Sequence, residues 1–418
     1  MLKQKIKAGV FRYARLFLYS FLIILSWLYC VGFRVALTWR RCRGGKTGYP
    51  FKVISVGNLA AGGTGKSVLV GLLVQRLGAQ QCAVVTRGYR GSNERTGKSL
   101  IVSDGQHLFA GPKVAGDEAV MHAVGLAVTV VVGVDRGRSC DLIAQQLLHI
   151  RYVILDDAYQ NFAVKPDCNI LLLDARAPFD NGYCLPAGRL RERDVSRADV
   201  IVFTHAAERA QILRDGASHL LRTSGTKQSI RNEFNTARPE PFVTATSSLP
   251  QGERHTESAI SARPEEPRRS VSEDGRLEGF EQNLAVLKIP HFYTNHKTDG
   301  IYLNNETLVP LQDLVGKPLV VCAGVGTPSS VQESVASLGL KVAHELFFDN
   351  HHAYAAADIE RLTDLVMAHH AAGILTTAKD WVKIAPFILQ HPKSPAVFVM
   401  RVGMVMIPSE IERLFNLF

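Results

Sequence analysis

The sequence has no C-x-x-C pair, although it contains seven cysteines. The scattered spacing excludes the usual zinc-ribbon pattern and indicates no disulfide framework. We therefore expect reduced thiols in a cytosolic domain. The seven cysteines are Cys30, Cys42, Cys82, Cys140, Cys168, Cys184 and Cys322.

Acidic residues are the minority charge, because 38 Asp and Glu face 48 Lys and Arg, for a formal net charge of +10. Such an excess indicates an anionic partner, such as nucleic acid, anionic lipid or a phosphorylated substrate. Much of the excess lies in the first 46 residues, which favours a membrane surface over nucleic acid. With 418 residues, 46% of them hydrophobic, the chain has enough material for two or three globular domains.

Charged residues are absent from residues 16–33, whereas basic residues are frequent on both sides of this run. The run is close to the shortest that can cross a bilayer. We see no small-residue cleavage site of a signal peptide, and cations on both flanks give no orientation. We predict a membrane-anchoring helix over residues 1–46 at the cytoplasmic face. Whether it spans the bilayer or lies in the interface stays open, and a buried core helix is the alternative.

Residues 53–70 read VISVGNLAAGGTGKSVLV, which is a β-rich run, a glycine-rich turn and an apolar stretch suited to a helix. This order is the context of a phosphate-binding loop. Glycine allows backbone N–H groups to converge on phosphate oxygens, and the helix N-terminus adds a partial positive charge. Lys66 would reach the β- and γ-phosphates, and the Ser67 hydroxyl would hold Mg²⁺. The predicted nucleotide-binding residues are Ala60, Ala61, Gly62, Gly63, Thr64, Gly65, Lys66 and Ser67.

The first position of the strict loop pattern is glycine, and this chain has Ala60 there, so only the relaxed pattern is met.

A second signal follows downstream, where the apolar run at residues 152–155 leads into Asp156 and Asp157. An apolar strand that ends in Asp is the Walker B arrangement, whose carboxylate coordinates Mg²⁺ directly or through water. A phosphate loop upstream favours this metal role.

Arginines also follow predicted strands, and such positions meet ligands in open α/β sheets. Arg87 follows the run at residues 83–86, and Arg136 follows the run at residues 128–134. Together with Arg191, they are our candidates for contact with an anionic substrate. The adjacent acids Asp117 and Glu118 open a predicted helix, where they would also be favourable partners of the helix dipole.

Short apolar runs alternate with helical patterns through residues 47–222, which predicts a doubly wound, mostly parallel sheet of the P-loop NTPase type. Residues 223–285 are rich in Ser, Pro, Arg and Glu and predict a disordered insertion. Residues 286–418 predict a two-stranded linker and a smaller α/β lobe. In this lobe we expect a helix over residues 358–370 with Asp358 as its N-cap.

Eight stretches resemble one known family and occur in its order over most of the chain from residue 53 onward. That family is the tetraacyldisaccharide 4′-kinases of lipid A biosynthesis. The stretches are VGNLAAGGTGKS (56–67), TRGYRG (86–91), GDE (116–118), LDDAYQN (155–161), PFDNGYCLPAGRLRE (178–192), AGVGTP (323–328), FFDNHHAY (347–354) and TTAKDWVK (376–383).

The resemblance implies an ATP-dependent enzyme that phosphorylates the 4′-hydroxyl of a tetraacylated glucosamine disaccharide 1-phosphate, with catalytic domains in the cytosol at the inner membrane. It implies no nucleic acid and no obligate protein partner. In such kinases the Asp of the GDE stretch pairs with a His from the second lobe, and here these residues are Asp117 and His351. With Lys66 they form the predicted catalytic set. The resemblance implies that Glu118, Asp156 and Asp157 handle Mg²⁺, in addition to Ser67 of the loop.

Two positions differ from the family pattern. Asn161 stands where the family usually has His, and Asn350 stands where it usually has Asp, with Asp349 one place earlier. The second difference leaves open which carboxylate orients His351. The stretch TTAKD ends a predicted strand near the cleft between the lobes, and its chemistry is unassigned.

Two other functions use a similar loop. A regulatory ATPase of the partitioning type carries a signature lysine six residues before the loop serine, and this chain has Ala61 there. A GTPase needs an N-K-x-D-like motif, which we do not find. The alternatives to the kinase are a membrane-associated regulatory ATPase, despite the missing lysine, and a non-catalytic nucleotide-dependent binding module.

Overall fold

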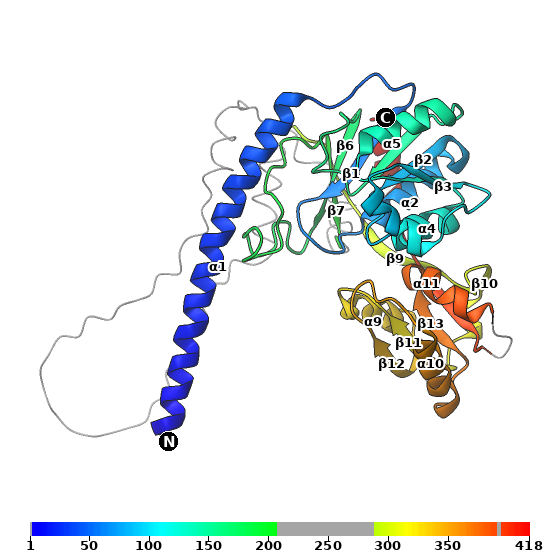
Figure 1. Cartoon of the computed structure of the whole chain (residues 1–418). Coiled ribbons are helices and arrows are strands. Elements are labelled where there is room, and N and C mark those ends of the chain that lie inside the picture. Colours follow the sequence, from blue (N-terminus) through cyan, green and yellow to red (C-terminus); the bar gives the residue numbers. More distant parts are fainter. Residues whose placement is uncertain (1, 207–287, 391–393) are drawn as a thin grey trace, which may run out of the picture. The chain divides into compact units, whose positions relative to one another are not determined.

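The computed structural model of the chain describes residues 2–206, 288–390 and 394–418 (Figure 1). The predicted insertion at residues 223–285 lies outside the described residues. The described part contains two sheets with their covering helices and a long N-terminal helix.

The N-terminal helix α1 spans Leu2–Arg43. Its segment Leu18–Cys42 is long and apolar enough to cross a membrane, and only 11% of the most apolar window is buried. This exposure does not fit a core helix, because apolar side chains on a core helix would be covered. The helix contacts the loop before β7 through Ser26, whose hydroxyl donates to the carbonyl of Cys184 at 2.7 Å.

The same contact contains a disulfide between Cys30 and Cys184. Our expectation of seven reduced thiols is therefore wrong for this pair. The two residues are 154 positions apart in sequence, and α1 brings them together by packing on the loop. The other cysteines are free thiols, and burial raises the pKa of Cys82 and Cys140 to about 12.

Among the described residues, the first sheet has eight strands in the order β3-β4-β2-β5-β1-β6-β7-β8, and only β3 runs antiparallel to its neighbour. Its strands are β1 (Lys52–Asn58), β2 (Cys82–Thr86), β3 (Leu100–Asp104), β4 (Thr129–Val132), β5 (Tyr152–Asp156), β6 (Cys168–Asp174), β7 (Val200–Thr204) and β8 (His291–Tyr293). Apolar, β-branched side chains fill the central strands, which suits a sheet covered on both faces.

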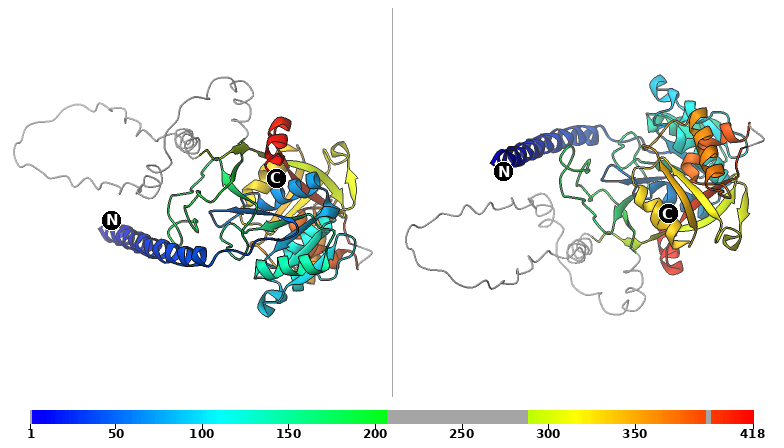
Figure 2. Two further views of the ribbon diagram at one scale, coloured as in Figure 1. Left: turned by 90° about the horizontal axis from the view of Figure 1, so that it is seen from above. Right: turned by 90° about the horizontal axis from the view of Figure 1, so that it is seen from below.

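Helices cover both faces of this sheet, as in a doubly wound fold (Figure 2). One face packs on α2 and α4, and the other packs on α5. The helical segments here are α2 (Lys66–Leu77), η1 (Ala79–Gln81), η2 (Ser92–Thr96), α3 (Pro112–Ala115), α4 (Asp117–Leu126) and α5 (Arg136–Gln146). The predicted doubly wound, mostly parallel α/β fold is confirmed.

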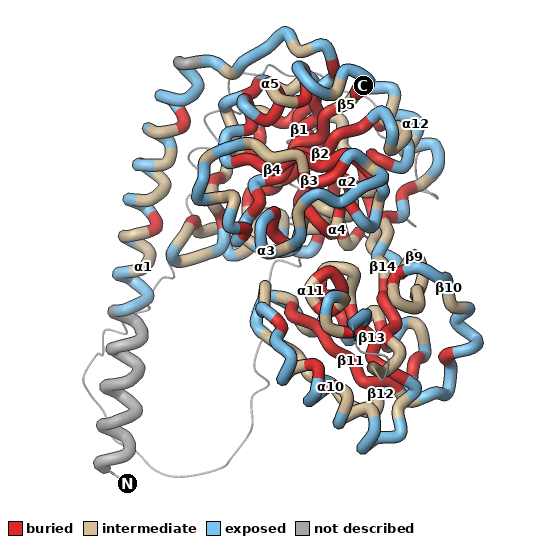
Figure 3. Tube along the Cα trace, turned by 45° about the vertical axis from the view of Figure 1, so that its right-hand side comes forward, coloured by how far each residue is buried: buried red, intermediate tan, exposed pale blue. Residues whose placement is uncertain are grey.

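The second sheet has six strands in the order β10-β9-β14-β13-β11-β12. Its strands are β9 (Asn295–Leu303), β10 (Thr307–Val309), β11 (Pro318–Ala323), β12 (Lys341–Phe347), β13 (Ile374–Thr377) and β14 (Val397–Val405). Its helical segments are η3 (Leu311–Asp313), α9 (Pro328–Ser337), α10 (Ala356–Ala368) and α11 (Ala378–Ile388). One face packs on α9 and the other on α10 and α11, so the central strands β11 and β13 and the first half of β14 are buried, whereas β10 and β12 at the sheet edges are more exposed (Figure 3).

We call each sheet with its covering helices a lobe. The antiparallel strands β9 and β14 connect the two lobes, since β9 follows β8 and β14 leads to α12 (Pro408–Phe415). Leu414 of α12 and Met404 of β14 belong to the core of the first lobe. The chain therefore enters the second lobe on β9 and returns on β14.

One predicted helix start is wrong. Helix α10 begins at Ala356, so Asp358 is its third residue and not its N-cap. The Asp358 carboxylate instead accepts a hydrogen bond from the backbone N–H of Ala355 at 2.9 Å. An acid at either position satisfies an N–H at the start of a helix, and for this reason the two positions look alike in sequence.

Candidate active site

The glycine-rich loop connects β1 to α2, as the sequence predicts. The Asn58 amide at the end of β1 donates to the carbonyl of Ala60 at 2.7 Å and to the Thr64 hydroxyl at 2.8 Å, which ties the two sides of the loop together. Gly65 has a φ of +83° and no room for a Cβ, because that atom would overlap His296. Only glycine fits this position without strain.

Lys66 and Asp157 face each other at the carboxyl ends of β1 and β5. The Lys66 ammonium lies 3.5 Å from the Asp157 carboxylate, and the Arg191 guanidinium lies 3.2 Å from the same group. Burial alone would raise the pKa of Asp157, but Lys66 and Arg191 outweigh burial, so the pKa lies below its ordinary value. Asp157 is thus an anion between two cations.

The neighbouring Asp156 is buried and contacts a residue that the sequence did not single out. Its Oδ2 lies 3.0 Å from Nε2 of His122 on α4, and its Oδ1 has no hydrogen-bond partner among the described residues. His122 lies on the apolar face of α4 beside Ala119 and Ala123. In the sequence, the only sign of this contact is that a histidine stands among apolar positions of a predicted helix. That sign does not identify Asp156 as the partner of His122.

The predicted pair Asp117 and His351 is brought together from different lobes. Asp117 is the first residue of α4, and its Oδ2 lies 3.6 Å from Nδ1 of His351. The Tyr89 ring meets the histidine ring edge to face, and the Arg90 guanidinium donates to the His351 carbonyl at 3.1 Å. His351 also has a φ of +62°, which is uncommon for a residue with a Cβ and is characteristic of functional sites.

Two lysines of the TTAKDWVK stretch reach the same pair, and this is the chemistry that the sequence left unassigned. The Lys379 ammonium lies 3.2 Å from Nε2 of His351 and 3.9 Å from the Glu118 carboxylate. The Lys383 ammonium lies 3.7 Å from Asp117 Oδ2. Burial lowers the pKa of Lys379, although Glu118 opposes this effect. Lysines from α11 therefore face the two acids that open α4.

The three predicted substrate arginines have different surroundings. Arg191 contacts Asp157, as described above, and Arg87 donates to Glu94 at 2.8 Å at an exposed position. Arg136 is buried, and its guanidinium donates to the carbonyls of Gly133 and Asp156 at 2.6 and 3.0 Å. Burial lowers the pKa of Arg136 to about 10. Contact between Arg136 and a substrate would require the guanidinium to leave these carbonyls.

The predicted Mg²⁺-handling residues do not form a ready-made cluster, since no three His, Cys, Asp or Glu among the described residues could hold a metal ion. Magnesium in phosphoryl-transfer sites is held by one or two carboxylates together with the phosphates of the nucleotide. The unpartnered oxygen of Asp156 and the nearby Asp157 fit this requirement. Glu118 lies beside Lys379 instead.

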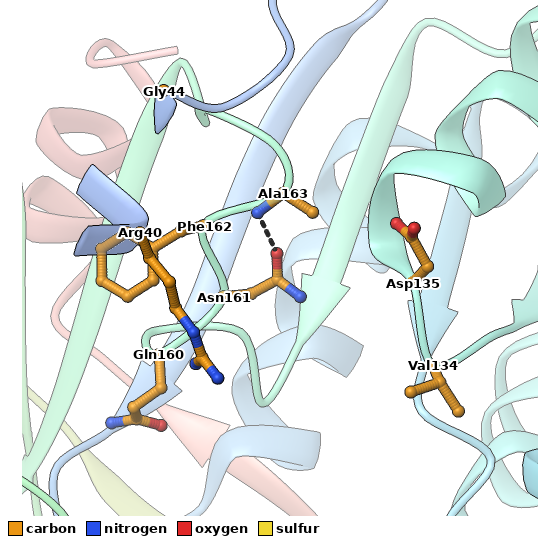
Figure 4. Close-up of a pocket in the computed structure, with 8 residues that line it drawn as sticks. All are labelled: Arg40, Gly44, Val134, Asp135, Gln160, Asn161, Phe162 and Ala163. Carbon is orange, nitrogen blue, oxygen red and sulfur yellow. Dashed lines mark hydrogen bonds between the residues drawn. The ribbon is translucent and has the colours of Figure 1, made fainter. Parts of the chain in front are cut away.

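A cavity of about 320 Å³ lies beside the loop that follows β5 (Figure 4). Arg40 of α1 lines it together with Gln160 and Asn161. The Asn161 side chain accepts from the backbone N–H of Ala163 at 2.9 Å, so it holds its own loop turn. The residue that differs from the family pattern thus has a local structural partner.

The fold and the phosphate-binding loop define the class of the protein, a two-lobed α/β protein of the P-loop NTPase type. A family model described as tetraacyldisaccharide-1-P 4′-kinase matches residues 18–416. The chain therefore belongs to the tetraacyldisaccharide 4′-kinase family, which consists of ATP-dependent enzymes of lipid A biosynthesis. This finding does not favour the regulatory ATPase.

Curated relatives are similar over most of their length. The tetraacyldisaccharide 4′-kinase of Geobacter metallireducens is 30% identical over 80% of this chain and 79% of its own. That of Desulfatibacillum aliphaticivorans is 31% identical over 81% and 76%. A crystal structure of the "apo" form of LpxK from Aquifex aeolicus in complex with ATP has a TM-score of 0.63 at 23% identity, covering 96% of this chain and 99% of that one. The structural likeness establishes the fold.

Proposed function

We propose that the chain transfers the γ-phosphate of ATP to the 4′-hydroxyl of a tetraacylated glucosamine disaccharide 1-phosphate. Family membership supports the reaction class. The observation that carries the assignment of residues is the pair of Asp117 and His351, which come from different lobes and face each other 3.6 Å apart. A hydroxyl acceptor needs a positioned base, and an isolated nucleotide-binding module does not.

In this mechanism Asp117 accepts the proton of the attacking hydroxyl, and His351 holds the carboxylate in place. Lys66 and the backbone N–H groups of residues 60–67 bind the nucleotide phosphates. Asp157 keeps Lys66 at the carboxyl end of β5 until nucleotide binds, because the two lie 3.5 Å apart. Phosphoryl transfer depends chiefly on such positioning and on charge neutralisation.

Magnesium, held by Ser67, Asp156 and Asp157, would neutralise charge on the transferring phosphates. We infer this set from the unpartnered Asp156 oxygen and from the place of Ser67 in the first turn of α2. Among the three candidate substrate arginines, Arg191 lies beside Asp157 and therefore has the most direct access to the proposed magnesium site. Arg87 and Arg136 remain predictions.

We also propose that α1 attaches the enzyme to the cytoplasmic face of the inner membrane. Large apolar side chains such as Trp27, Leu28 and Trp39 are exposed along the helix. Their exposure would be costly in water and is favourable in a bilayer interface, where Trp is enriched. Protease treatment of inverted inner-membrane vesicles should digest the lobes, whereas lobes that resist digestion would place them on the other side.

The test of the kinase is transfer of labelled γ-phosphate from ATP to the purified disaccharide 1-phosphate in detergent micelles. Lys66→Ala serves as the control, because it removes the phosphate-binding ammonium. Labelled lipid that depends on Lys66 supports the proposal. Intact ATP hydrolysis without labelled lipid would mean that the acceptor is assigned wrongly.

A further inference from the structure

The start of α11 is held rigidly in the second lobe. The buried Asp380 carboxylate accepts from the backbone N–H of Gly324 at 3.0 Å and from the Thr377 hydroxyl at 2.8 Å, and Lys383 lies 3.0 Å from its other oxygen. Thr377 in turn caps the helix by accepting from the N–H of Asp380. These contacts anchor the first turn, and with it the backbone from which the Lys379 side chain extends.

Three acceptors surround the Lys379 ammonium. They are Nε2 of His351 at 3.2 Å, the amide oxygen of Asn350 at 3.4 Å and the Glu118 carboxylate at 3.9 Å. A lysine ammonium has three N–H donors and no acceptor, so Lys379 is the donor to both His351 and Asn350, and Glu118 adds an ionic contact. The His351 nitrogen that faces Lys379 must therefore present its lone pair.

We infer that Lys379 is a positioning residue that fixes His351 in the tautomer with its proton on Nδ1. This inference rests on the proposed function and deepens it. Because Nε2 accepts from Lys379, the ring N–H lies on Nδ1 and is directed at Asp117 Oδ2. A proton on Nε2 would point at an ammonium that cannot accept it.

The tautomer of His351 determines which group accepts the proton of the attacking hydroxyl. The bond between the 4′ oxygen and the γ-phosphorus forms, the bond from that phosphorus to the bridging oxygen breaks, and ADP leaves. The hydroxyl proton goes to the Asp117 carboxylate, while His351 keeps its single ring proton and orients the acid. Lys379 thus acts on the reaction through His351, in the way that a third residue orients the base of a triad.

This arrangement also gives Asn350 a role. Its amide oxygen accepts from Lys379 and adds no charge beside the histidine. Neither Asn350 nor Asp349 needs to orient His351, because the two ring nitrogens face Asp117 and Lys379.

The first test is ¹⁵N NMR of the full-length protein labelled at histidine in detergent, without lipid substrate. The His351 signals are identified by their loss in His351→Asn. We expect protonated Nδ1 and unprotonated Nε2 in the wild-type protein and in Lys379→Arg, and a changed tautomer population in Lys379→Met. Lys341→Met, at an exposed position of β12, is the matched control and should leave the signals unchanged. Protonated Nε2 in the wild type, or an unchanged population in Lys379→Met, would overturn the inference.

The second test separates kcat from KM. We expect Lys379→Met to lower kcat for lipid phosphorylation roughly 10²-fold while KM for ATP stays within about two-fold, because general-base catalysis is typically worth 10²–10⁴. Lys379→Arg should recover most of the loss, and unchanged circular dichroism controls for folding. If kcat is unaltered in Lys379→Met, the inference about Lys379 is overturned, whereas the proposed function is not affected. If the wild type yields no labelled lipid, the proposed function fails, and the NMR result still decides the tautomer.

Discussion

The two lobes share an architecture, but at their contact the first lobe contributes acids and the second contributes a histidine and lysines. In the first lobe Lys66 and Asp157 follow β1 and β5, whereas Asp117 opens α4. In the second lobe His351 follows β12 and has a left-handed backbone conformation, and Lys379 and Lys383 lie in the first two turns of α11, which follows β13. Strand ends place groups at one edge of a parallel sheet, and this rule can be read from sequence. The carboxyl ends of β12 and β13 place the second-lobe groups in the same way, and their contribution depends on contact with the acids that open α4.

The comparison predicts that removing one group from either lobe has the same large effect. Asp117→Ala and His351→Ala should each lower turnover by about 10²- to 10⁴-fold, because in the proposed mechanism the two residues act as one unit in moving the proton. ATP affinity should stay within a few-fold in both variants. The double variant should be little worse than either single one, as measured by transfer of labelled phosphate. Fully multiplicative losses would show that the two lobes act independently.

Within the second lobe, Lys383→Met should strongly lower the free energy of unfolding. Lys383 pairs with Asp380 at 3.0 Å, and both side chains are buried, so the variant leaves an uncompensated carboxylate. Breaking such a pair costs about 3–5 kcal/mol. Urea unfolding of the double variant Asp380→Asn with Lys383→Met is the control. It should be less destabilised than Lys383→Met, and the reverse order would contradict the buried pair.

On the strand between the lobes, His296 should make the protein sensitive to mild acid. Burial, with a contribution from His205, lowers the pKa of His296 from 6.5 to about 4. Between pH 6.5 and 4 the unfolded chain binds a proton that the folded chain does not, so stability falls as the pH falls, by about 3 kcal/mol in total.

The groups that face His296 allow a controlled test of this effect. His205 lies 3.1 Å from its Nδ1, and Asp174 with Arg176 lies behind His205. The pKa of Asp174 is lowered, so this acid stays ionised through the same pH range. As the pH falls from 6.5 to 4, the thermal unfolding midpoint should drop less steeply in His296→Phe than in the wild type. Parallel curves would exclude His296 as the cause.

The smallest effect is expected where α1 meets the first lobe. Arg41 and Asp194 form an ion pair at 2.6 Å, with 39% and 34% of their side chains exposed. Exposed pairs are worth about 0–1 kcal/mol and are screened by salt. Arg41→Ala should therefore change the unfolding free energy by less than 1 kcal/mol and leave turnover unaltered. A larger loss would show that this contact holds the lobe as firmly as Lys383 does.

Sequence reasoning was most accurate in the first lobe. The predicted run at residues 152–155 became β5, and the glycine-rich turn before Lys66 opens α2 as expected. These features depend on local composition, which a single sequence contains.

The features that sequence reasoning missed depend on distant contacts. His122 meets Asp156 from another element, and Cys30 meets Cys184 across 154 residues. Likewise, Lys379 acquires its role only because α11 packs on α4. Local periodicity predicts which face of a helix is buried but not which residue it meets, and for this reason the lysines stayed unassigned.

Because of the two connecting strands, the second lobe is an insertion in the chain of the first lobe. Asn295 and Val405 are paired neighbours in β9 and β14, so the segment between them leaves and rejoins the chain at one place. A segment with adjacent ends can be exchanged or inserted with little loop entropy. The His351 and Lys379 side chains could therefore be transplanted as a unit between relatives, with β8 and α12 left in the core of the first lobe.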